Sequence, residues 1–462
     1  MTETIKTALR ESAFARWTAV LLMSVAMLFA YIFVDAISPF QEIFERDFGW
    51  TPDVFGVAGG AAYFLNMLGF IVIAGIILDK IGVRRSAIVA AILMITGGVI
   101  KSYGVSYAFN NGGFGFDFFN SFLPRFSPSA KVSILGFAIF GAGMEMAGIT
   151  VPKAIVKWFR GREMALAMGL SVAIGRLGLV LIFAVLPRIE SWVGLPTTIA
   201  LSALVMCVGF LAFGAYYFMD VKLEREDQES DVPEDAFRFS DLKQIFTSKA
   251  FMIISGLCVL YYVSIFTFQR FAVGMLESRF AGHDNLLMQP SDLFSFFPVG
   301  AMLLTPLLGL FLDYRGKGAS MLIWGAGLMA LCHVAFALTP ASLFSFPLAF
   351  LAIVILGVSF SLVPAALWPA VPRLVENKVL GSAYAVIFWI QNIGLFSAPI
   401  LIGHLLYATN VGVDVAAGEH RDFTSVMLVF ASFGVAALLL GFWLKAEDKK
   451  KGYGLELPNK VK

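Results

Sequence analysis

The chain has 462 residues, of which 59% are hydrophobic and 14% are charged, and its formal net charge is +2. Because a soluble globular domain carries about 25% charged residues, this composition excludes an ordinary soluble domain, and the long apolar runs indicate a membrane protein with helical spans. So small a net charge gives no reason to expect a nucleic-acid partner. The three cysteines and four histidines have no metal-ligand spacing, so we expect neither a metal nor a cofactor.

Apolar runs of about 20 residues recur along the chain, and each is long enough for one transmembrane helix. A charged segment that contains a proline, residues 220–247, separates the sixth run from the seventh. We therefore predict an all-α membrane protein with a six-helix N-terminal half (1–219), a cytoplasmic linker (220–247) and a six-helix C-terminal half with a short basic tail (248–462). The twelve predicted spans lie near residues 17–40, 55–78, 84–103, 131–153, 163–187, 195–219, 248–274, 292–313, 318–340, 345–370, 379–408 and 421–444.

The distribution of lysine and arginine predicts the orientation of these spans. If both termini are cytoplasmic, most of the 34 basic residues lie on the cytoplasmic side of the membrane, in agreement with the positive-inside rule. The opposite topology would place most of them outside. We therefore expect both ends of the chain in the cytoplasm.

A short loop pattern occurs twice, once after the second predicted span and once after the eighth. The first copy reads AGIILDKIGVRRS and the second LGLFLDYRGKGAS, with a glycine four residues before an aspartate in each. Two six-helix halves with such a loop resemble the major facilitator superfamily, and the resemblance implies its fold and transport by alternating access. The resemblance assigns a conformational gating loop to Gly75, Asp79, Lys80, Gly82, Arg84, Arg85 and Asp313.

The first copy departs from the superfamily pattern at one position, because Val83 is inserted before the basic pair. We expect the aspartate of the pattern, Asp79, to bind the end of a helix. It can face the N-terminus of a helix from the other half and accept hydrogen bonds from its free N–H groups. The basic residues would then hold the loop at the lipid headgroups.

Three ionisable residues stand out within the predicted spans: Asp35, Glu145 and Arg176. A charge at the centre of a bilayer costs at least about 2.5–3.5 kcal/mol, so each needs a function or a partner. Asp35 lies four residues after Tyr31, towards the outer end of the first span. It is either an interfacial residue or a substrate or proton site.

Glu145 and Arg176 lie deeper, at depths that differ by roughly 7–8 Å if both spans are regular helices. They can form an internal salt bridge, or they can bind the two ends of a zwitterion. A dipeptide is roughly 7 Å long, and Glu145 would bind its ammonium group while Arg176 binds its carboxylate. In a third alternative Arg176 alone binds an organic anion and Glu145 titrates. Glycines at 141, 143, 148, 169, 175 and 178 predict close helix packing around this region.

A longer block around the two charges, EMAGITVPKAIVKWFRGREMALAMGLSVAIGRLG, carries a closer resemblance. It resembles the major facilitator superfamily domain-containing protein one group, whose lysosomal member is a dipeptide transporter. This resemblance implies dipeptide transport, with the two charges at the substrate termini and aromatic and amide side chains of the C-terminal half lining the site. The implied substrate-binding residues are Tyr31, Asp35, Glu145, Arg176, Tyr261, Tyr262, Trp368, Gln391 and Asn392.

These features predict a secondary-active or facilitative dipeptide transporter rather than an enzyme, since no nucleophile–base arrangement, metal cluster or nucleotide-binding loop is evident. The alternatives are an organic-anion, monocarboxylate or sugar-acid transporter that uses Arg176, with proton coupling through Glu145 or Asp35, and a membrane receptor that does not transport. The partners expected are a small-molecule substrate and the lipid bilayer, with the protein a monomer. No glycosylation sequon and no acidic dileucine signal occur, so we expect a bacterial inner-membrane protein rather than a lysosomal one.

Overall fold

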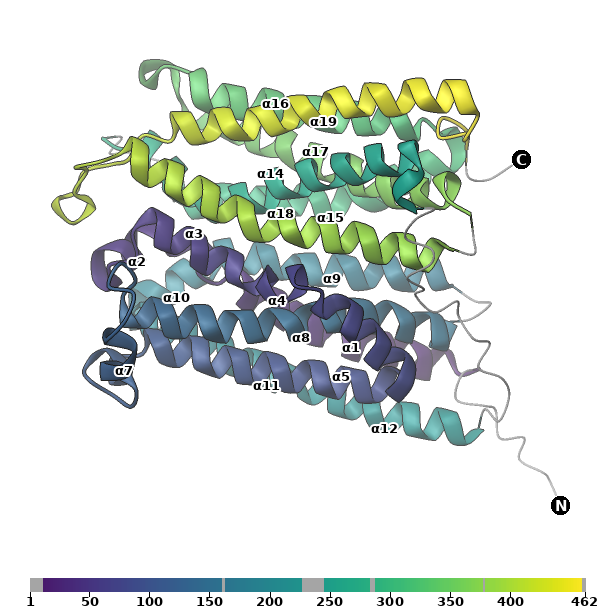
Figure 1. Ribbon diagram of the computed structural model, residues 1–462, viewed down its shortest axis with the longest axis horizontal. Coiled ribbons are helices and arrows are strands. Elements are labelled where there is room, and N and C mark those ends of the chain that lie inside the picture. Colours follow the sequence, from purple (N-terminus) through teal and green to yellow (C-terminus); the bar gives the residue numbers. More distant parts are fainter. Residues whose placement is uncertain (1–10, 160–162, 227–244, 283–286, 377–378, 459–462) are drawn as a thin grey trace.

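The protein is seen here in a computed structural model, which describes residues 11–159, 163–226, 245–282, 287–376 and 379–458. Within these residues the chain is almost entirely helical, has no strand, and forms one bundle of long helices that run roughly side by side (Figure 1). The middle of the predicted linker, residues 227–244, lies outside the described residues. The helix before it continues to Glu226, beyond the boundary predicted at residue 219.

The N-terminal half contains both long helices and several short segments at one end of the bundle. Its elements are α1 (Ala13–Val34), η1 (Ser38–Phe40), α2 (Gln41–Phe48), α3 (Pro52–Gly60), η2 (Ala61–Tyr63), α4 (Phe64–Met67), α5 (Phe70–Val105), α6 (Tyr107–Asn110), α7 (Phe116–Asn120), α8 (Pro128–Phe159), α9 (Met164–Ala184), α10 (Leu186–Val193), α11 (Leu195–Gly209) and α12 (Leu211–Glu226).

The C-terminal half is more regular. Its elements are α14 (Lys249–Arg279), α15 (Pro290–Arg315), α16 (Gly318–Leu338), η3 (Ala341–Leu343), α17 (Phe346–Leu374), α18 (Leu380–Thr409), η5 (Val415–Ala417) and α19 (Thr424–Lys451).

Eleven helices in the described residues are long and apolar enough to cross a membrane, and a bent pair gives a twelfth. The span predicted near residues 55–78 is this bent pair, in which Pro52–Met67 and Phe70–Leu78 meet at 53°. The bend contains Gly69, whose φ of +99° lies in the left-handed region that glycine adopts at little cost. Nearby, the side-chain amide of Asn66 donates to the backbone oxygen of Gly141 on α8 (3.2 Å), which ties the bend to the neighbouring helix.

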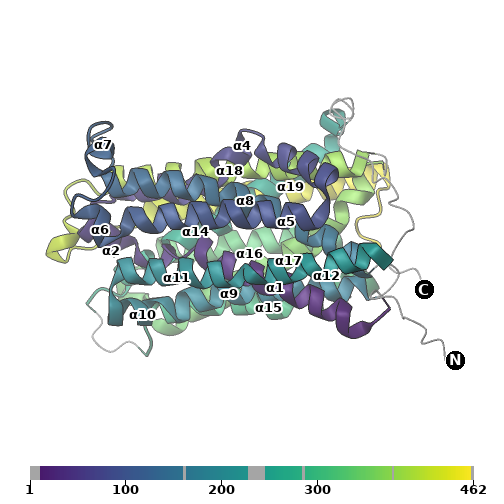
Figure 2. The same ribbon diagram turned by 90° about the horizontal axis from the view of Figure 1, so that it is seen from below.

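The two halves lie against each other along the length of the bundle, with the C-terminal half above the N-terminal half in Figure 1. Contacts between the halves are made chiefly by α3 with α18 and by α9 with α15. Helix α1 begins and α19 ends at the same end of the bundle, which we call the terminus side; α2, α7 and α10 lie at the opposite end, the far side (Figures 1 and 2).

The predicted close packing at glycines is correct at four positions and wrong at two. A Cβ placed on Gly141 would lie 1.7 Å from the backbone oxygen of Ala62, and Gly143, Gly175 and Gly178 are also in close contact with neighbouring helices. At residues 148 and 169, by contrast, a Cβ would meet no atom within 4 Å. Helix α8 is therefore in close contact with η2 at Gly141, whereas about two turns later, at Gly148, no neighbouring atom is close.

This contrast gives a matched pair of substitutions on one helix. Gly141→Ala is expected to lower the melting temperature of the purified protein in detergent by several degrees, because the added methyl group forces α8 away from Ala62 at a cost of about 1–3 kcal/mol. Gly148→Ala should leave the melting temperature unchanged or raise it, because alanine has the higher helix propensity and the methyl group has free space. Equal losses in both variants would show that α8 does not depend on this contact.

Candidate functional site

Arg176 lies on α9 and reaches across the boundary between the halves. Its Nη1 donates hydrogen bonds to the backbone oxygen of Ala301 (2.9 Å) and to Oγ1 of Thr305 (2.7 Å), both on α15. Its guanidinium carbon lies 4.8 Å from the ring centre of Phe360 on α17. No hydrogen bond within the described residues uses Nε or Nη2, so one edge of the planar guanidinium remains for a bidentate carboxylate.

Glu145 lies on α8 and faces α18 of the other half. Its side chain is half-buried and lies beside the amide of Asn392. On this part of α18 two amide oxygens, Oε1 of Gln391 and Oδ1 of Asn392, are buried and accept no hydrogen bond from the part of the chain that the structure describes. Buried polar atoms normally have partners, so these oxygens are available to a bound group that carries N–H or O–H donors.

The two charges do not neutralise each other. No ion pair joins Glu145 to Arg176 in the described chain, although each faces the C-terminal half from its own helix. The internal salt bridge, one of the alternatives that the sequence leaves open, is therefore absent from this conformation. The carboxylate of Glu145 and the guanidinium of Arg176 can therefore each bind a ligand group of opposite charge.

Aromatic side chains of the C-terminal half surround the region near Arg176. The hydroxyl of Tyr262 on α14 accepts a hydrogen bond from Nε1 of Trp368 on α17 (3.0 Å). Trp368 also stacks on Phe388 of α18 with ring centres 5.0 Å apart. Three helices of the C-terminal half are thereby joined by aromatic contacts that face the N-terminal half.

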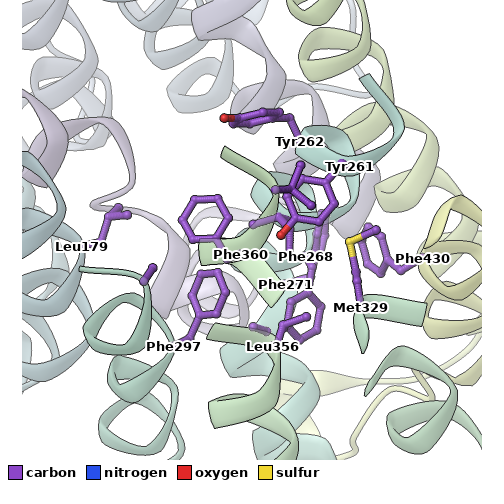
Figure 3. Close-up of a cluster of buried hydrophobic side chains, with 14 of the residues drawn as sticks. Leu179, Tyr261, Tyr262, Phe268, Phe271, Phe297, Met329, Leu356, Phe360 and Phe430 are labelled. Carbon is purple, nitrogen blue, oxygen red and sulfur yellow. The ribbon is translucent and has the colours of Figure 1, made fainter. Parts of the chain in front are cut away.

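The predicted pair Tyr261 and Tyr262 is split between two environments. Figure 3 shows the ring of Tyr261 among buried side chains such as Phe268, Phe271 and Met329, whereas Tyr262 lies at the edge of this cluster. Tyr261 is fully buried, and its hydroxyl lies 3.3 Å from Oγ of Ser359. The structure therefore places Tyr261 in the core of the C-terminal half and Tyr262 at the edge of that core, and both lie close enough to Arg176 to interact with its charge.

Tyr31 is brought beside Arg176 by a glycine. It lies on α1, and a Cβ on Gly175 of α9 would come within 2.9 Å of its ring. Only a glycine at position 175 lets the ring pack this closely against the helix that carries the guanidinium. Arg176 thus lies within electrostatic reach of three predicted site residues, Tyr31, Tyr261 and Tyr262. Glu145 lies beside Asn392, next to Gln391 in the sequence.

Asp35 lies elsewhere, in a buried polar cluster at the far side. As the C-cap residue of α1, it accepts a hydrogen bond from Nε2 of Gln269 (2.9 Å) and lies 3.6 Å from Nη2 of Arg270. Arg270 is only 2% exposed and also donates to the backbone oxygen of Gly59. Because Gln269 and Arg270 belong to α14 and the other two residues to the N-terminal half, this cluster joins the halves.

Sequence reasoning missed Arg270 and a second buried cation, Lys101. Both lie within a few residues of the end of a predicted span, where a basic residue is easily assigned to a loop. Lys101 is 1% exposed, its Nζ lies 3.6 Å from the ring centre of Phe137, and it makes no hydrogen bond within the described residues. The signal that could have found them is a basic residue flanked on both sides by apolar residues, as in SIFTFQRFAVG and GGVIKSYGV.

Comparison of the sequence with models of protein families identifies the family of this chain. Residues 23–288, more than half of the chain, match the model of the Major Facilitator Superfamily. The chain belongs to the major facilitator superfamily. Solved structures of superfamily proteins agree with this fold: a mutant of the peptide transporter POT superposes with a TM-score of 0.68 at 12% identity, covering 95% of this chain and 96% of that one. The nucleoside transporter NupG gives a TM-score of 0.62 at 14% identity, covering 93% and 99%.

Relatives of this chain within the superfamily carry the name lysosomal dipeptide transporter MFSD1. The protein from Bos taurus is 29% identical over 286 residues, which is 59% of this chain and 58% of that protein. The protein from Mus musculus is 26% identical over 347 residues, or 72% of this chain and 68% of that protein. The alignment thus spans little more than half the length of the cattle protein, and the bacterial origin expected from the sequence is not tested by these relatives.

The loop pattern of the superfamily contains a glycine with a positive φ in both halves. In the first copy Gly82 has a φ of +78° and interrupts α5, and in the second Gly316 has a φ of +72° directly after α15. Each glycine comes three residues after the aspartate of its copy, Asp79 or Asp313. No atom lies within 4 Å of a Cβ placed on Gly75, so this glycine makes no close approach here.

The side chains of the first copy are placed at the terminus side. Arg84 lies with its guanidinium carbon 5.7 Å from the ring centre of Tyr217 on α12, and Lys80 and Arg85 are exposed. The side chain of Asp79 lies outside the described part of the structure. Its predicted contact with a helix of the other half therefore stays a prediction.

The halves are in backbone contact along the far side. A Cβ on Gly56 of α3 would lie 2.2 Å from the backbone oxygen of Pro399 on α18, and a Cβ on Gly403 would lie 2.2 Å from that of Pro52. Such distances leave no room for a side chain, so α3 and α18 close this end of the bundle. The far side offers no passage between the two helices.

Ion pairs between the halves also lie at the far side. Arg188 on α10 pairs with Asp292 at the start of α15 (2.8 Å), and Glu45 on α2 pairs with Arg421. At the terminus side, several ion pairs lie within one half each: Arg16–Glu163, Lys157–Asp220, Lys249–Glu447, Lys317–Glu456 and Lys445–Glu456. The conformation is closed at the far side, where backbone contact and these ion pairs join the halves.

Proposed function

We propose that this protein is a secondary-active or facilitative transporter of dipeptides that works by alternating access. Glu145 would bind the amino terminus of the substrate and Arg176 its carboxylate. The observation that carries the proposal is that these two opposite charges, both on the N-terminal half, face the C-terminal half without pairing with each other. A zwitterion is the ligand class that satisfies both charges at once.

The amide side chains beside Glu145 support a peptide rather than a simple amino acid. A peptide bond carries an N–H donor between the two charged ends, and the buried oxygens of Gln391 and Asn392 are acceptors without a partner in the described residues. The aromatic group around Tyr262 and Trp368 offers flat apolar surface, which tolerates side chains of different shape. The MFSD1 relatives bear the name of dipeptide transporters, which is consistent with this substrate class.

Alternating access is supported by the asymmetry between the two ends of the bundle. The far side is closed by backbone contact and by ion pairs between the halves, whereas pairs such as Arg16–Glu163 and Lys249–Glu447 at the terminus side lie within single halves. Breaking the first set and forming new contacts at the terminus side would expose the same central site to the opposite face. With both termini in the cytoplasm, as the basic residues suggest, this conformation faces inward.

We further propose that the protein is a monomer in a bacterial inner membrane. This placement rests on the absence of a glycosylation sequon and of an acidic dileucine signal in the sequence. The orientation can be checked by fusing a reporter that is active only in the cytoplasm to the C-terminus. Activity of that reporter is expected, and inactivity of a stably inserted fusion would reverse the orientation.

A ligand screen tests the substrate class. Dipeptides are expected to raise the melting temperature of the purified protein, whereas free amino acids, monocarboxylates and dicarboxylates should not, because only the dipeptide spans both charges. Stabilisation by carboxylates alone would favour the organic-anion alternative. Counterflow of a labelled dipeptide in proteoliposomes then separates a transporter, which exchanges label, from a receptor, which binds dipeptide without flux.

A further inference from the structure

A groove on the outer surface of the C-terminal half has no part in the substrate site. It lies between α15, α16 and α17 and has a volume of about 510 Å³. Its walls are apolar over most of their length, formed by Leu308, Phe311, Trp324, Leu328 and Leu362. Phe311 is 45% and Trp324 67% exposed on helices long and apolar enough to span the membrane, so the groove opens towards lipid.

The terminus-side end of the groove is polar and basic. Lys317 and Ser320 line it there, at the start of α16. The ammonium group of Lys445 on α19 donates to Oγ of Ser320 (2.6 Å), and both lysines lie 3.8 Å from the carboxylate of Glu456. Two ammonium groups share one carboxylate, which leaves an excess positive charge at the mouth of an apolar groove.

The backbone at Lys317 indicates that its side chain has a role. Lys317 has a φ of +73° and is one of two residues other than glycine with positive φ in the described chain. The left-handed conformation costs a residue with a Cβ roughly 1–2 kcal/mol, which a glycine would avoid, and glycines stand on both sides of this lysine. A lysine kept in a position that suits glycine is a sign of function at the side chain rather than at the backbone.

We propose that this groove binds an anionic glycerophospholipid. The phosphate group would lie at the ammonium group of Lys317, which is 61% exposed, whereas the hydroxyl of Ser320 is already bonded to Glu456 and Lys445. From Ser320 to Leu328 along α16 the groove runs for roughly 12 Å, enough for much of an acyl chain to lie against Trp324. Basic pockets between transmembrane helices are suited to anionic headgroups, and this proposal does not depend on what the protein transports.

Lipid binding by the purified, delipidated full-length protein tests the proposal. Phosphatidylglycerol is expected to raise the melting temperature more than phosphatidylcholine of the same acyl composition, and native mass spectrometry should show a retained phosphatidylglycerol molecule. Lys317→Gly removes the ammonium group while suiting the backbone conformation, so the lipid-free melting temperature should hold. Its affinity for phosphatidylglycerol should fall roughly fivefold, as expected for one lysine near a charged headgroup, and the preference over phosphatidylcholine should shrink.

Two further variants make the outcome decisive. Lys222→Ala removes an exposed lysine on α12 in the other half and should retain the full preference for phosphatidylglycerol. Leu328→Trp narrows the apolar part of the groove and should weaken both lipids without changing the charge at the mouth. The proposal is overturned if the unmodified protein binds both lipids equally, or if Lys317→Gly and a folded Leu328→Trp both bind phosphatidylglycerol as the unmodified protein does.

Discussion

Proteoliposomes that contain Arg176→Ala are expected to take up labelled dipeptide on the order of 10²-fold more slowly than those with the unmodified protein. Removing one partner of a buried, hydrogen-bonded charge pair costs about 2–5 kcal/mol, and here the partner would be the substrate carboxylate. Glu145→Gln should lose flux by a similar factor, because the neutral amide cannot hold an ammonium group through charge. Initial rates of uptake and counterflow measure both losses.

A control is needed because Arg176 also binds α15. Thr305→Val removes the hydroxyl that accepts from Nη1 at 2.7 Å but leaves the guanidinium in place, so dipeptide flux should stay within a few-fold of normal. Arg176→Lys keeps the charge and loses the planar fork, and it should transport poorly. If Thr305→Val impairs flux as much as Arg176→Ala does, Arg176 serves chiefly to join α9 to α15.

The variants Glu145→Gln and Arg176→Ala also distinguish a transporter of dipeptides from a transporter of simple organic anions. A dipeptide carrier needs both charges, whereas a carrier of simple organic anions needs only Arg176. If the substrate is a dipeptide, Glu145→Gln is therefore expected to slow dipeptide flux on the order of 10²-fold and to transport no simple carboxylate. Normal dipeptide flux in both Glu145→Gln and Arg176→Ala would disprove the zwitterion site.

The number of spans and the family were accessible from the sequence because they depend on length and pattern. An apolar run of about 20 residues has few other uses than a membrane span, and the repeated glycine–aspartate loop in two six-helix halves is typical of the superfamily. Glu145 and Arg176 were found for a related reason, since a charge near the centre of such a run is costly. Their relation to each other was not accessible, because it depends on which way α8 and α9 face.

Local breaks and charges near span ends were harder to predict. The second span reads as one apolar run, yet Gly69 takes a left-handed conformation and bends it. Arg270 and Lys101 lie near span ends, where a long basic side chain can normally reach the headgroups. Here packing from other parts of the chain encloses them, with Asp35 from α1 beside Arg270 and Phe137 beside Lys101. Contacts between distant segments are not visible in hydropathy.

The buried pair of Arg270 and Asp35 is expected to control closure of the far side. Arg270→Gln leaves the Asp35 carboxylate enclosed without its cation, and such a loss destabilises a folded arrangement by about 3–5 kcal/mol. Because the two residues belong to different halves, the penalty applies to the far-side-closed conformation and is relieved when the halves separate there. The melting temperature should fall, and the far side should open more often.

Labelling of a single cysteine measures that opening. Ser38 in η1 is fully buried and belongs to a segment that contacts α14, so Ser38→Cys should react slowly with a membrane-impermeant maleimide once the natural cysteines at 207, 258 and 332 have been replaced by serine. Adding Arg270→Gln should speed labelling by at least tenfold.

Two comparisons show whether this effect comes from the buried charge. Asp35→Asn combined with Arg270→Gln removes both charges of the pair and should restore much of the stability and slow labelling again, because the carboxylate that lost its guanidinium is also neutralised. Lys249→Gln breaks a half-exposed pair that lies within the C-terminal half and does not join the halves, so it should not speed labelling at the far side. If Arg270→Gln behaves like Lys249→Gln, the far side is held closed by the backbone contact of α3 with α18 rather than by this ion pair.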